Sequence, residues 1–280
     1  MERSSGRMRS FLLTLGFGLL TWLHPDTAGA QQATDSSDGP GSVLAEAVYN
    51  RPDGASAVVL AKMTLRRARG SDRVREFYSF RMDFPEGEVR SLTRFTLPGN
   101  VAGVGLLVHS KAEAADDQWL FLPALERIRR ISSENRGGRF VQSGLYYEDL
   151  RDRKPEKDRH EVLGEGDYEG TPVTLLQSTP IDPTSSVYSR KVSWIHEPTL
   201  LPLRIEYFQG GEEPIKYLEV KRLDRIQGYW TATETVITHP KDSEETILTN
   251  LTTSYDVEFP ESVFDTSSLQ DPQAEALLLP

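Results

Sequence analysis

The feature that most constrains the fold is an alternation of apolar and polar side chains with a period of two. It is clearest over residues 201–208, L-P-L-R-I-E-Y-F, where every odd-numbered residue is apolar or aromatic. Similar alternation runs through residues 59–66 and 77–84. Side chains of a β-strand point alternately to its two faces, so this period predicts strands with one buried face. A helix would repeat every 3.6 residues instead.

Turn-forming residues punctuate these runs at intervals typical of hairpins. Breaks at 69–72, 85–87 and 98–100 contain Gly, Pro, Asn or Asp, and they predict an antiparallel meander in the first half. Further strands are predicted at 160–164, 168–178, 187–196, 201–209, 215–223, 228–238 and 245–255. Roughly ten strands exceed what an open sheet accommodates without curling. We therefore expect a mainly β protein, whose strongly curved antiparallel sheet forms an incomplete, half-open β-barrel, with a few short helices covering its concave face.

The first thirty residues have the pattern of a cleavable secretory signal peptide. Three arginines precede an uncharged, mostly apolar run of 13 residues at 11–23, and small residues follow at 28–30. A spanning helix needs about 18 or more apolar residues, so we expect no membrane span after cleavage. A retained membrane anchor is the alternative.

The rest of the chain is predicted to form a single domain with a polar segment at each end. Residues 31–41 are rich in Gly and Ser and predict a flexible leader. The single domain is placed at 42–265, where a short amphipathic helix from Ser42 to about Asn50 precedes the strands. Residues 266–280 are predicted to form a disordered tail.

The charge and cysteine content exclude several classes of protein. The chain has no cysteine, so it has neither disulfides nor thiolate metal sites. Its net charge is −10, and residues 1–30 contribute three Arg against Glu2 and Asp26, which leaves −10 − 1 = −11 for the remainder. Such an acidic chain is not expected to bind nucleic acid, which requires a cationic surface, or to adhere broadly to anionic headgroups.

No catalytic or metal-binding motif is evident. The five histidines are scattered, without the spacing of metal ligands, and the chain lacks G-x-S-x-G, P-loop and G-x-G-x-x-G motifs. Adjacent acidic pairs such as Asp116-Asp117 diverge on a strand and favour solvated turns over a glycosidase pair. We expect a protein that is not an enzyme and has no cofactor or metal; a hydrolase with an unrecognised site is the remaining alternative.

Residues 119–150 gather cations and aromatic residues in one stretch of this acidic chain. An apolar run, W-L-F-L-P, is followed by five arginines between 127 and 139, a Gly-Gly pair and the segment L-Y-Y-E-D-L. The candidate ligand-binding residues of the cavity and its rim are Trp119, Phe121, Arg127, Arg129, Arg130, Phe140, Tyr146 and Tyr147.

Two interpretations of this stretch remain open. In the first, Trp119 and Phe121 face an apolar hollow, and arginines around its mouth bind carboxylate or phosphate through paired hydrogen bonds. In the second, the aromatic residues belong to the core of the sheet. The arginines would then pair with the nearby acidic residues Glu126, Glu134, Glu148 and Asp149.

The same residues carry a resemblance to a known family. The runs W-L-F-L-P-A-L (119–125), R-I-R-R-I (127–131) and Y-E-D-L (147–150) resemble the signature of the LolA-like outer-membrane lipoprotein-sorting family, and residues 257–264 resemble its final strand. The resemblance covers residues 42–265. One position departs from it: where the family usually has F-M-G-S-D-F, this chain has F-V-Q-S-G-L at 140–145 and lacks the aspartate.

The resemblance implies an unclosed β-barrel with helices over its opening and a hydrophobic cavity between them. Such proteins are similar to carriers that shield acyl chains in the periplasm, and this branch resembles companions of transporters of the resistance-nodulation-division (RND) type. We therefore predict a periplasmic, non-enzymatic carrier of a lipid or of lipoprotein acyl chains, which exchanges its cargo with an RND-type or other envelope transporter. The alternative is an interaction module that scaffolds such a transporter without carrying lipid.

Overall fold

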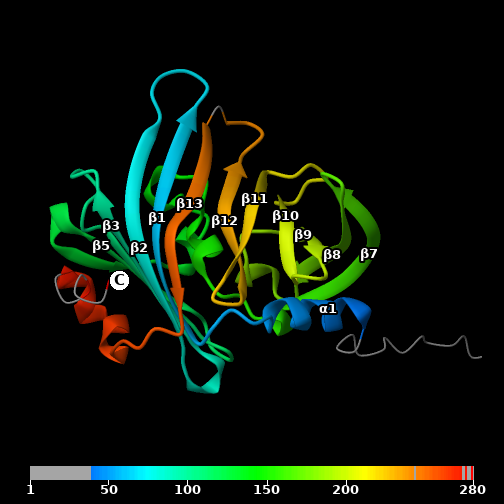
Figure 1. Ribbon diagram of the computed structural model, residues 1–280, viewed down its shortest axis with the longest axis horizontal. Coiled ribbons are helices and arrows are strands. Elements are labelled where there is room, and N and C mark those ends of the chain that lie inside the picture. The colour runs from blue at the N-terminus through cyan, green and yellow to red at the C-terminus, as the bar shows by residue number, and fades with distance from the viewer. Residues whose placement is uncertain (1–38, 243, 273–274, 276–278, 280) are drawn as a thin grey trace, which may run out of the picture. The chain divides into compact units, whose positions relative to one another are not determined.

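The computed structural model describes residues 39–242, 244–272, 275 and 279. The predicted signal peptide and residues 31–38 of the predicted leader lie outside these residues. The described residues form one antiparallel sheet of 13 strands that does not close, together with one α-helix and several 3₁₀ turns (Figure 1). The prediction of a mainly β, half-open barrel is confirmed.

The helix is α1 (Pro40–Tyr49). The strands are β1 (Ser56–Arg67), β2 (Arg73–Asp83), β3 (Val89–Leu97), β4 (Gly105–Ser110), β5 (Asp117–Leu122), β6 (Arg127–Arg130), β7 (Asp158–Tyr168), β8 (Thr171–Pro180), β9 (Arg190–His196), β10 (Leu201–Phe208), β11 (Lys216–Ile226), β12 (Tyr229–Thr238) and β13 (Glu244–Tyr255). The 3₁₀ turns are η2 (Pro85–Gly87), η3 (Pro123–Leu125), η4 (Ser133–Asn135), η5 (Phe140–Gln142), η6 (Tyr147–Leu150), η7 (Pro155–Lys157), η8 (Pro183–Ser185), η9 (Glu261–Phe264) and η10 (Thr266–Gln270).

Two meanders, β1–β6 and β7–β13, join into one sheet because the last strand pairs with the first. The strand order is β6-β5-β4-β3-β2-β1-β13-β12-β11-β10-β9-β8-β7. The β1–β13 ladder runs from Ala57 opposite Tyr255 to Arg67 opposite Glu244, with a bulge between Leu60 and Ala61. Bulges bend and twist a strand, so those in β13, β10 and β11 help the long sheet to curve.

The two edge strands carry features that oppose pairing with another chain. The edge strand β6 is only four residues long, and three of them are exposed arginines. The edge strand β7 has a register shift between Val162 and Gly164. Short length, charge and bulges are the usual protections of an exposed strand edge.

The helix α1 packs against strands of the second meander. Pro40 occupies its first turn, where the missing N–H is not needed. Leu44, Ala45 and Val48 pack against Leu176 and Ile195. The predicted helix of residues 42–50 is therefore present, with its start two residues earlier.

The sheet has two packed faces, and we call the one on the concave side the inner face. The outer face is covered by the C-terminal turns η9 and η10. Its cluster combines sheet residues with residues of these turns: Val58, Tyr78, Phe80, Leu92, Leu107, Val263, Phe264 and Leu269.

The prediction of a disordered tail is wrong for residues 266–272. Residues 266–270 form η10, and its Leu269 is fully buried. Glu275 is also buried and forms an ion pair with Arg94, both 1% exposed. The polar composition of residues 266–272 made them look disordered, although Leu269 packs in the outer cluster.

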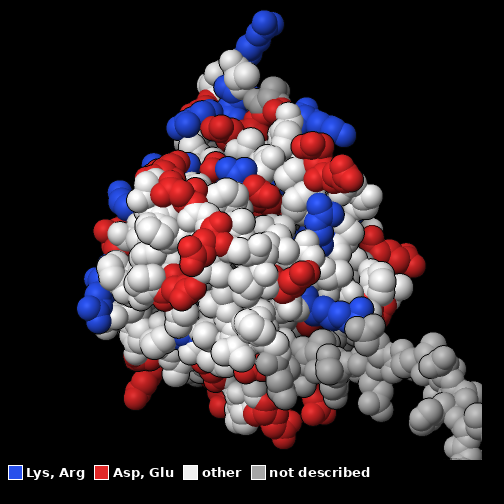
Figure 2. Space-filling model, turned by 90° about the vertical axis from the view of Figure 1, so that its right-hand side faces the viewer, with Lys and Arg blue, Asp and Glu red and all other residues white. Residues whose placement is uncertain are grey.

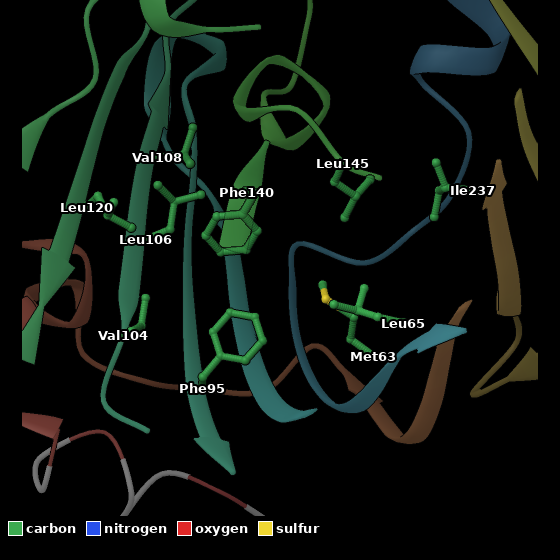
Figure 3. Packing of buried hydrophobic residues seen from close by; sticks show 10 residues of the cluster. All are labelled: Met63, Leu65, Phe95, Val104, Leu106, Val108, Leu120, Phe140, Leu145 and Ile237. Atoms are coloured by element: carbon green, nitrogen blue, oxygen red, sulfur yellow. The ribbon is translucent and has the colours of Figure 1, made fainter. Parts of the chain in front are cut away.

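The inner face is partly filled by the segment that follows β6, and Figure 1 shows the sheet curving around this green segment. Phe140 and Leu145 of the segment lie among residues of β1, β3, β4, β5 and β12 (Figure 3). The cluster is Met63, Leu65, Phe95, Val104, Leu106, Val108, Leu120, Phe140, Leu145 and Ile237. The segment after β6 thus fills part of the concave side of the sheet, and the remaining space forms the hollows described below.

Candidate functional site

Trp119 and Phe121 point to the outer face, so the prediction that they face the hollow is wrong. Both pack against the outer cluster, and the Trp119 ring lies edge-on to His109 with centroids 4.9 Å apart. Their neighbours Leu120 and Leu122 point inward. Every residue of the run W-L-F-L is apolar, so alternation could not indicate which set faces inward.

The arginines of β6 divide between the two faces. Arg127 and Arg129 lie opposite Leu122 and Leu120 and therefore on the inner side. Arg130 lies opposite Trp119 on the outer side and forms an ion pair with Asp117. The structure thus does not bring the three predicted arginines together at one mouth.

Phe140 is a core residue. It is 1% exposed, and its ring lies 5.6 Å from that of Phe95 and 5.8 Å from that of Tyr147. The following residues Val141 and Gln142 have positive φ angles of 45° and 61°, which are uncommon for residues other than glycine. This turn directs the Val141 carbonyl toward Arg75.

Tyr146 belongs to a buried cage around a lysine. Lys216, which is 1% exposed, forms an ion pair with Asp149. Its Nζ lies 4.4 Å, 4.8 Å and 4.2 Å from the ring centroids of Tyr146, Tyr188 and Tyr207, and the Tyr188 hydroxyl donates to Asp149 at 2.7 Å. Burial raises the pKa of Tyr188 and lowers that of Lys216, while Asp149 opposes the fall for Lys216.

The acidic residues of Y-Y-E-D-L fix the central segment to the second meander. Glu148 accepts hydrogen bonds from the Ser186 hydroxyl and from the Val187 N–H at 2.8 Å. Asp149 also accepts from the Tyr146 N–H at 2.6 Å. The alternative in which these acids pair with nearby arginines is wrong, because their side-chain partners Ser186, Tyr188 and Lys216 lie far away in the sequence.

One hollow lies on the inner face where the strands carry short side chains; we call it the inner hollow. Its volume is about 410 Å³, and short side chains from β1, β2, β3 and β12 form much of its wall. They include Ala57, Val59, Ser79, Ser91, Thr93 and Ala232. Sequence analysis missed these residues, although the alternate small side chains Ala57, Val59 and Ala61 of β1, and Ser91 and Thr93 of β3, were a usable signal.

One end of the inner hollow carries charged side chains, and these form ion pairs with one another. Arg81 donates to the Asp53 carboxylate at 3.3 Å and to the Gly54 carbonyl, and Arg51 lies 3.5 Å from Asp53. This end adjoins a polar cleft of about 560 Å³ that also contains Tyr49 and Lys154. The hollow is therefore of mixed polarity, not the wholly apolar trough expected.

A second hollow, which we call the arginine pocket, lies between the edge of the first meander and the turn at Val141. Its volume is about 640 Å³. Its walls combine three arginines with apolar residues and Tyr147: Arg73, Arg75, Arg139, Val74, Pro98, Val101, Val104, Leu120, Leu122 and Val141, with Asn100 and Gln142. No acidic residue is among its described lining residues. Tyr147, a predicted site residue, thus does border a hollow.

On one face of the molecule, charged side chains of both signs are mixed (Figure 2). Figure 2 shows the side of the molecule at the right of Figure 1, where acidic and basic side chains are interspersed among uncharged areas. Among the described residues, no group of three or more His, Cys, Asp or Glu is placed to hold a metal ion. No helix within the described ranges is long and apolar enough to span a membrane.

Comparison with known proteins identifies the family. A family model described as an uncharacterized protein matches residues 87–271. A protein domain from Vibrio parahaemolyticus, assigned to outer membrane lipoprotein sorting, is 29% identical with a TM-score of 0.78, over 82% of this chain and 98% of that one. The chain belongs to the LolA-like outer-membrane lipoprotein-sorting family.

Two further structures are similar to this LolA-like chain. A DUF1329 family protein from Desulfovibrio piger is 29% identical with a TM-score of 0.77, over 81% of this chain and 96% of that one. A LolA superfamily protein from Nitrosomonas europaea is 17% identical with a TM-score of 0.64, over 81% and 98%, and this likeness shows the fold alone. No curated protein matches the chain.

Proposed function

We propose that this LolA-like protein is a periplasmic, non-enzymatic carrier that binds a lipid, or the acyl chains of a lipoprotein, in the inner hollow. The observation that carries the proposal is the hollow itself, about 410 Å³ on the inner face of an open sheet. Ligand sites commonly have volumes of about 300–1,000 Å³. The signal-like residues 1–30 support export to the periplasm.

The lining of the inner hollow suits a chain with a polar end. Ala57, Val59 and Ala232 offer apolar wall to methylene groups, and each buried methylene contributes about 0.8 kcal/mol. A chain of about a dozen carbons would then bind near micromolar affinity after the cost of association. The hydroxyl and charged groups at the Arg51–Asp53 end can face the polar end of the ligand.

The test is to fill the inner hollow with a larger side chain. In Val59→Trp the larger side chain occupies the space at the wall, so uptake of a fluorescent fatty acid should fall about tenfold or more. Leu251→Trp is the matched control, because Leu251 is 56% exposed and does not line the hollow. Native mass spectrometry of protein purified from the periplasm should show bound lipid. Consistently empty protein that takes up no fatty acid would contradict the carrier function.

The exposed edge strand β6 supports a second candidate, a scaffold that contacts an envelope transporter. Arg127 and Arg129 are exposed and form no ion pair with a described residue. In the scaffold, Arg129→Glu together with Arg130→Glu should abolish the cellular function while lipid uptake survives. In the carrier, Val59→Trp should abolish function and uptake together.

A further inference from the structure

We propose that the arginine pocket is a second binding site, distinct from the inner hollow, for the acidic headgroup of an anionic amphiphile. The carboxylate or phosphate group binds Arg75, and the first part of its alkyl chain lies against the apolar wall. The two hollows share no lining residue. The buried side chains Phe95, Phe140 and Leu145 belong to the core cluster of the inner face and line neither hollow.

Arg75 is the central group of this site. It is only 6% exposed, and its Nη1 donates to the Val141 carbonyl and approaches Met63 Sδ at 4.0 Å. It forms no ion pair with any residue in the described part of the chain. Burying a cation without a counter-charge is unfavourable, so a bound anion would supply the charge that Arg75 lacks. Burial and the neighbouring Arg73 lower the pKa of Arg75, while Glu244 opposes this.

Two further arginines flank Arg75. Arg73 is paired with Glu244 at 2.8 Å, and Arg139 is paired with Asp242. Both acids lie outside the pocket lining, and the side chains of Arg73 and Arg139 are 34% and 38% exposed. Three guanidinium groups therefore face one hollow that no described acid lines, and guanidinium binds carboxylate and phosphate through paired hydrogen bonds.

The remaining walls favour an alkyl chain over a small inorganic anion. Val101, Val104, Leu120 and Leu122 form an apolar surface next to the arginines. The pocket volume of about 640 Å³ leaves room for several methylene groups beside the headgroup. Cations beside an apolar wall match a ligand with an acid at one end and hydrocarbon at the other.

The experiment compares decanoate, decyl phosphate and 1-decanol, which share one chain length, by isothermal titration calorimetry on the full mature chain. The unaltered protein should bind at least one acid about tenfold or more tightly than decanol, because hydrogen bonds between charged groups are stronger than those of a neutral hydroxyl. The preferred acid identifies the headgroup. Arg75→Met should remove this preference. Arg139→Gln, in which Arg75 is retained, should reduce it about threefold or more.

Arg66→Gln is the control, since Arg66 is 56% exposed on the same hairpin and lies outside the pocket. Thermal melts verify that each variant is folded. Equal affinities for acid and alcohol, no binding of any of the three, or undiminished acid binding in both Arg75→Met and Arg139→Gln would overturn the proposal. Val59→Trp separates the two hollows: acid binding that survives it supports the arginine pocket, and acid binding that it alone abolishes assigns the ligand to the inner hollow.

Discussion

At the scale of single residues, the buried ion pair of Lys216 and Asp149 is the most consequential contact. The two charged groups are 1% and 4% exposed, and three tyrosine rings surround the ammonium group. Such a pair contributes little net stability compared with apolar residues, but removing one partner leaves the other charge buried and unpaired. The pair therefore ties the position of η6 to that of β11.

Replacing Lys216 with Met tests this coupling. The variant should lose about 3–5 kcal/mol of unfolding free energy, because Asp149 remains buried without its cation. Chemical denaturation measures the loss. The control is Lys221→Met, in which an ion pair with Glu169 at a 31% exposed lysine is removed; it should cost less than about 1 kcal/mol. If Lys216→Met lost equally little unfolding free energy, the ion pair would not be what fixes η6 to β11.

The residues of the candidate site were only partly predictable. Phe140 and Leu145 of the central stretch do lie at the inner face, and Tyr147 borders a hollow. The orientation of Trp119 could not be predicted, because residues 119–122 are apolar on both faces of β5. Arg75 sits in a strand with ordinary alternation, and only the tertiary structure shows that no described acid accompanies it. Its lack of an acidic partner among the described residues is a property of the fold and leaves no local pattern in the sequence.

At the scale of elements, the alternation of β2 and β10 was sufficient to predict strands there. It failed for β4, where residues 105–110 are mostly apolar and buried, so a strand covered on both faces looks like an uninterrupted apolar run. It also failed for η9 and η10. Short 3₁₀ turns have no period of their own, and their burial depends on the sheet beneath them.

The C-terminal cover of the outer face is expected to be essential for stability. Phe264 is fully buried, and its ring lies 5.7 Å from Phe84 and 5.8 Å from Phe259. Phe264→Ala should cost about 3–5 kcal/mol, because it opens a cavity between cover and sheet. Denaturation in urea, with dye binding to exposed apolar surface, measures it. Leu125→Ala is the control, since Leu125 is 62% exposed. A change below about 1 kcal/mol would mean that the cover is dispensable.

At the scale of the whole molecule, the half-buried His109 and the buried His239 are expected to make stability depend on pH. His109 donates from Nε2 to the Phe264 carbonyl at 2.8 Å, and His239 donates to that of Gly144 at 2.9 Å. Burial lowers the pKa of both below the usual 6.5. Below pH 6.5 the unfolded chain therefore binds more protons than the folded chain, and stability falls as the pH falls.

We expect the unfolding free energy to decrease between about pH 6.5 and pH 5, above the range in which ordinary carboxylates titrate. The double variant His109→Gln, His239→Gln keeps a donor at each site and should flatten this part of the profile. Urea denaturation across the range measures both proteins. An identical slope in the double variant would assign the pH dependence to other groups.

The open edges of the sheet have a consequence for how this protein behaves at high concentration. A ribbon of 13 strands that never closes offers two unsatisfied rows of amide and carbonyl groups, the same chemistry by which fibrils grow. The arginines at one border and the kink at the other interrupt that growth. We therefore expect the barrel to stay open without polymerising, so that the proposed ligand can enter it.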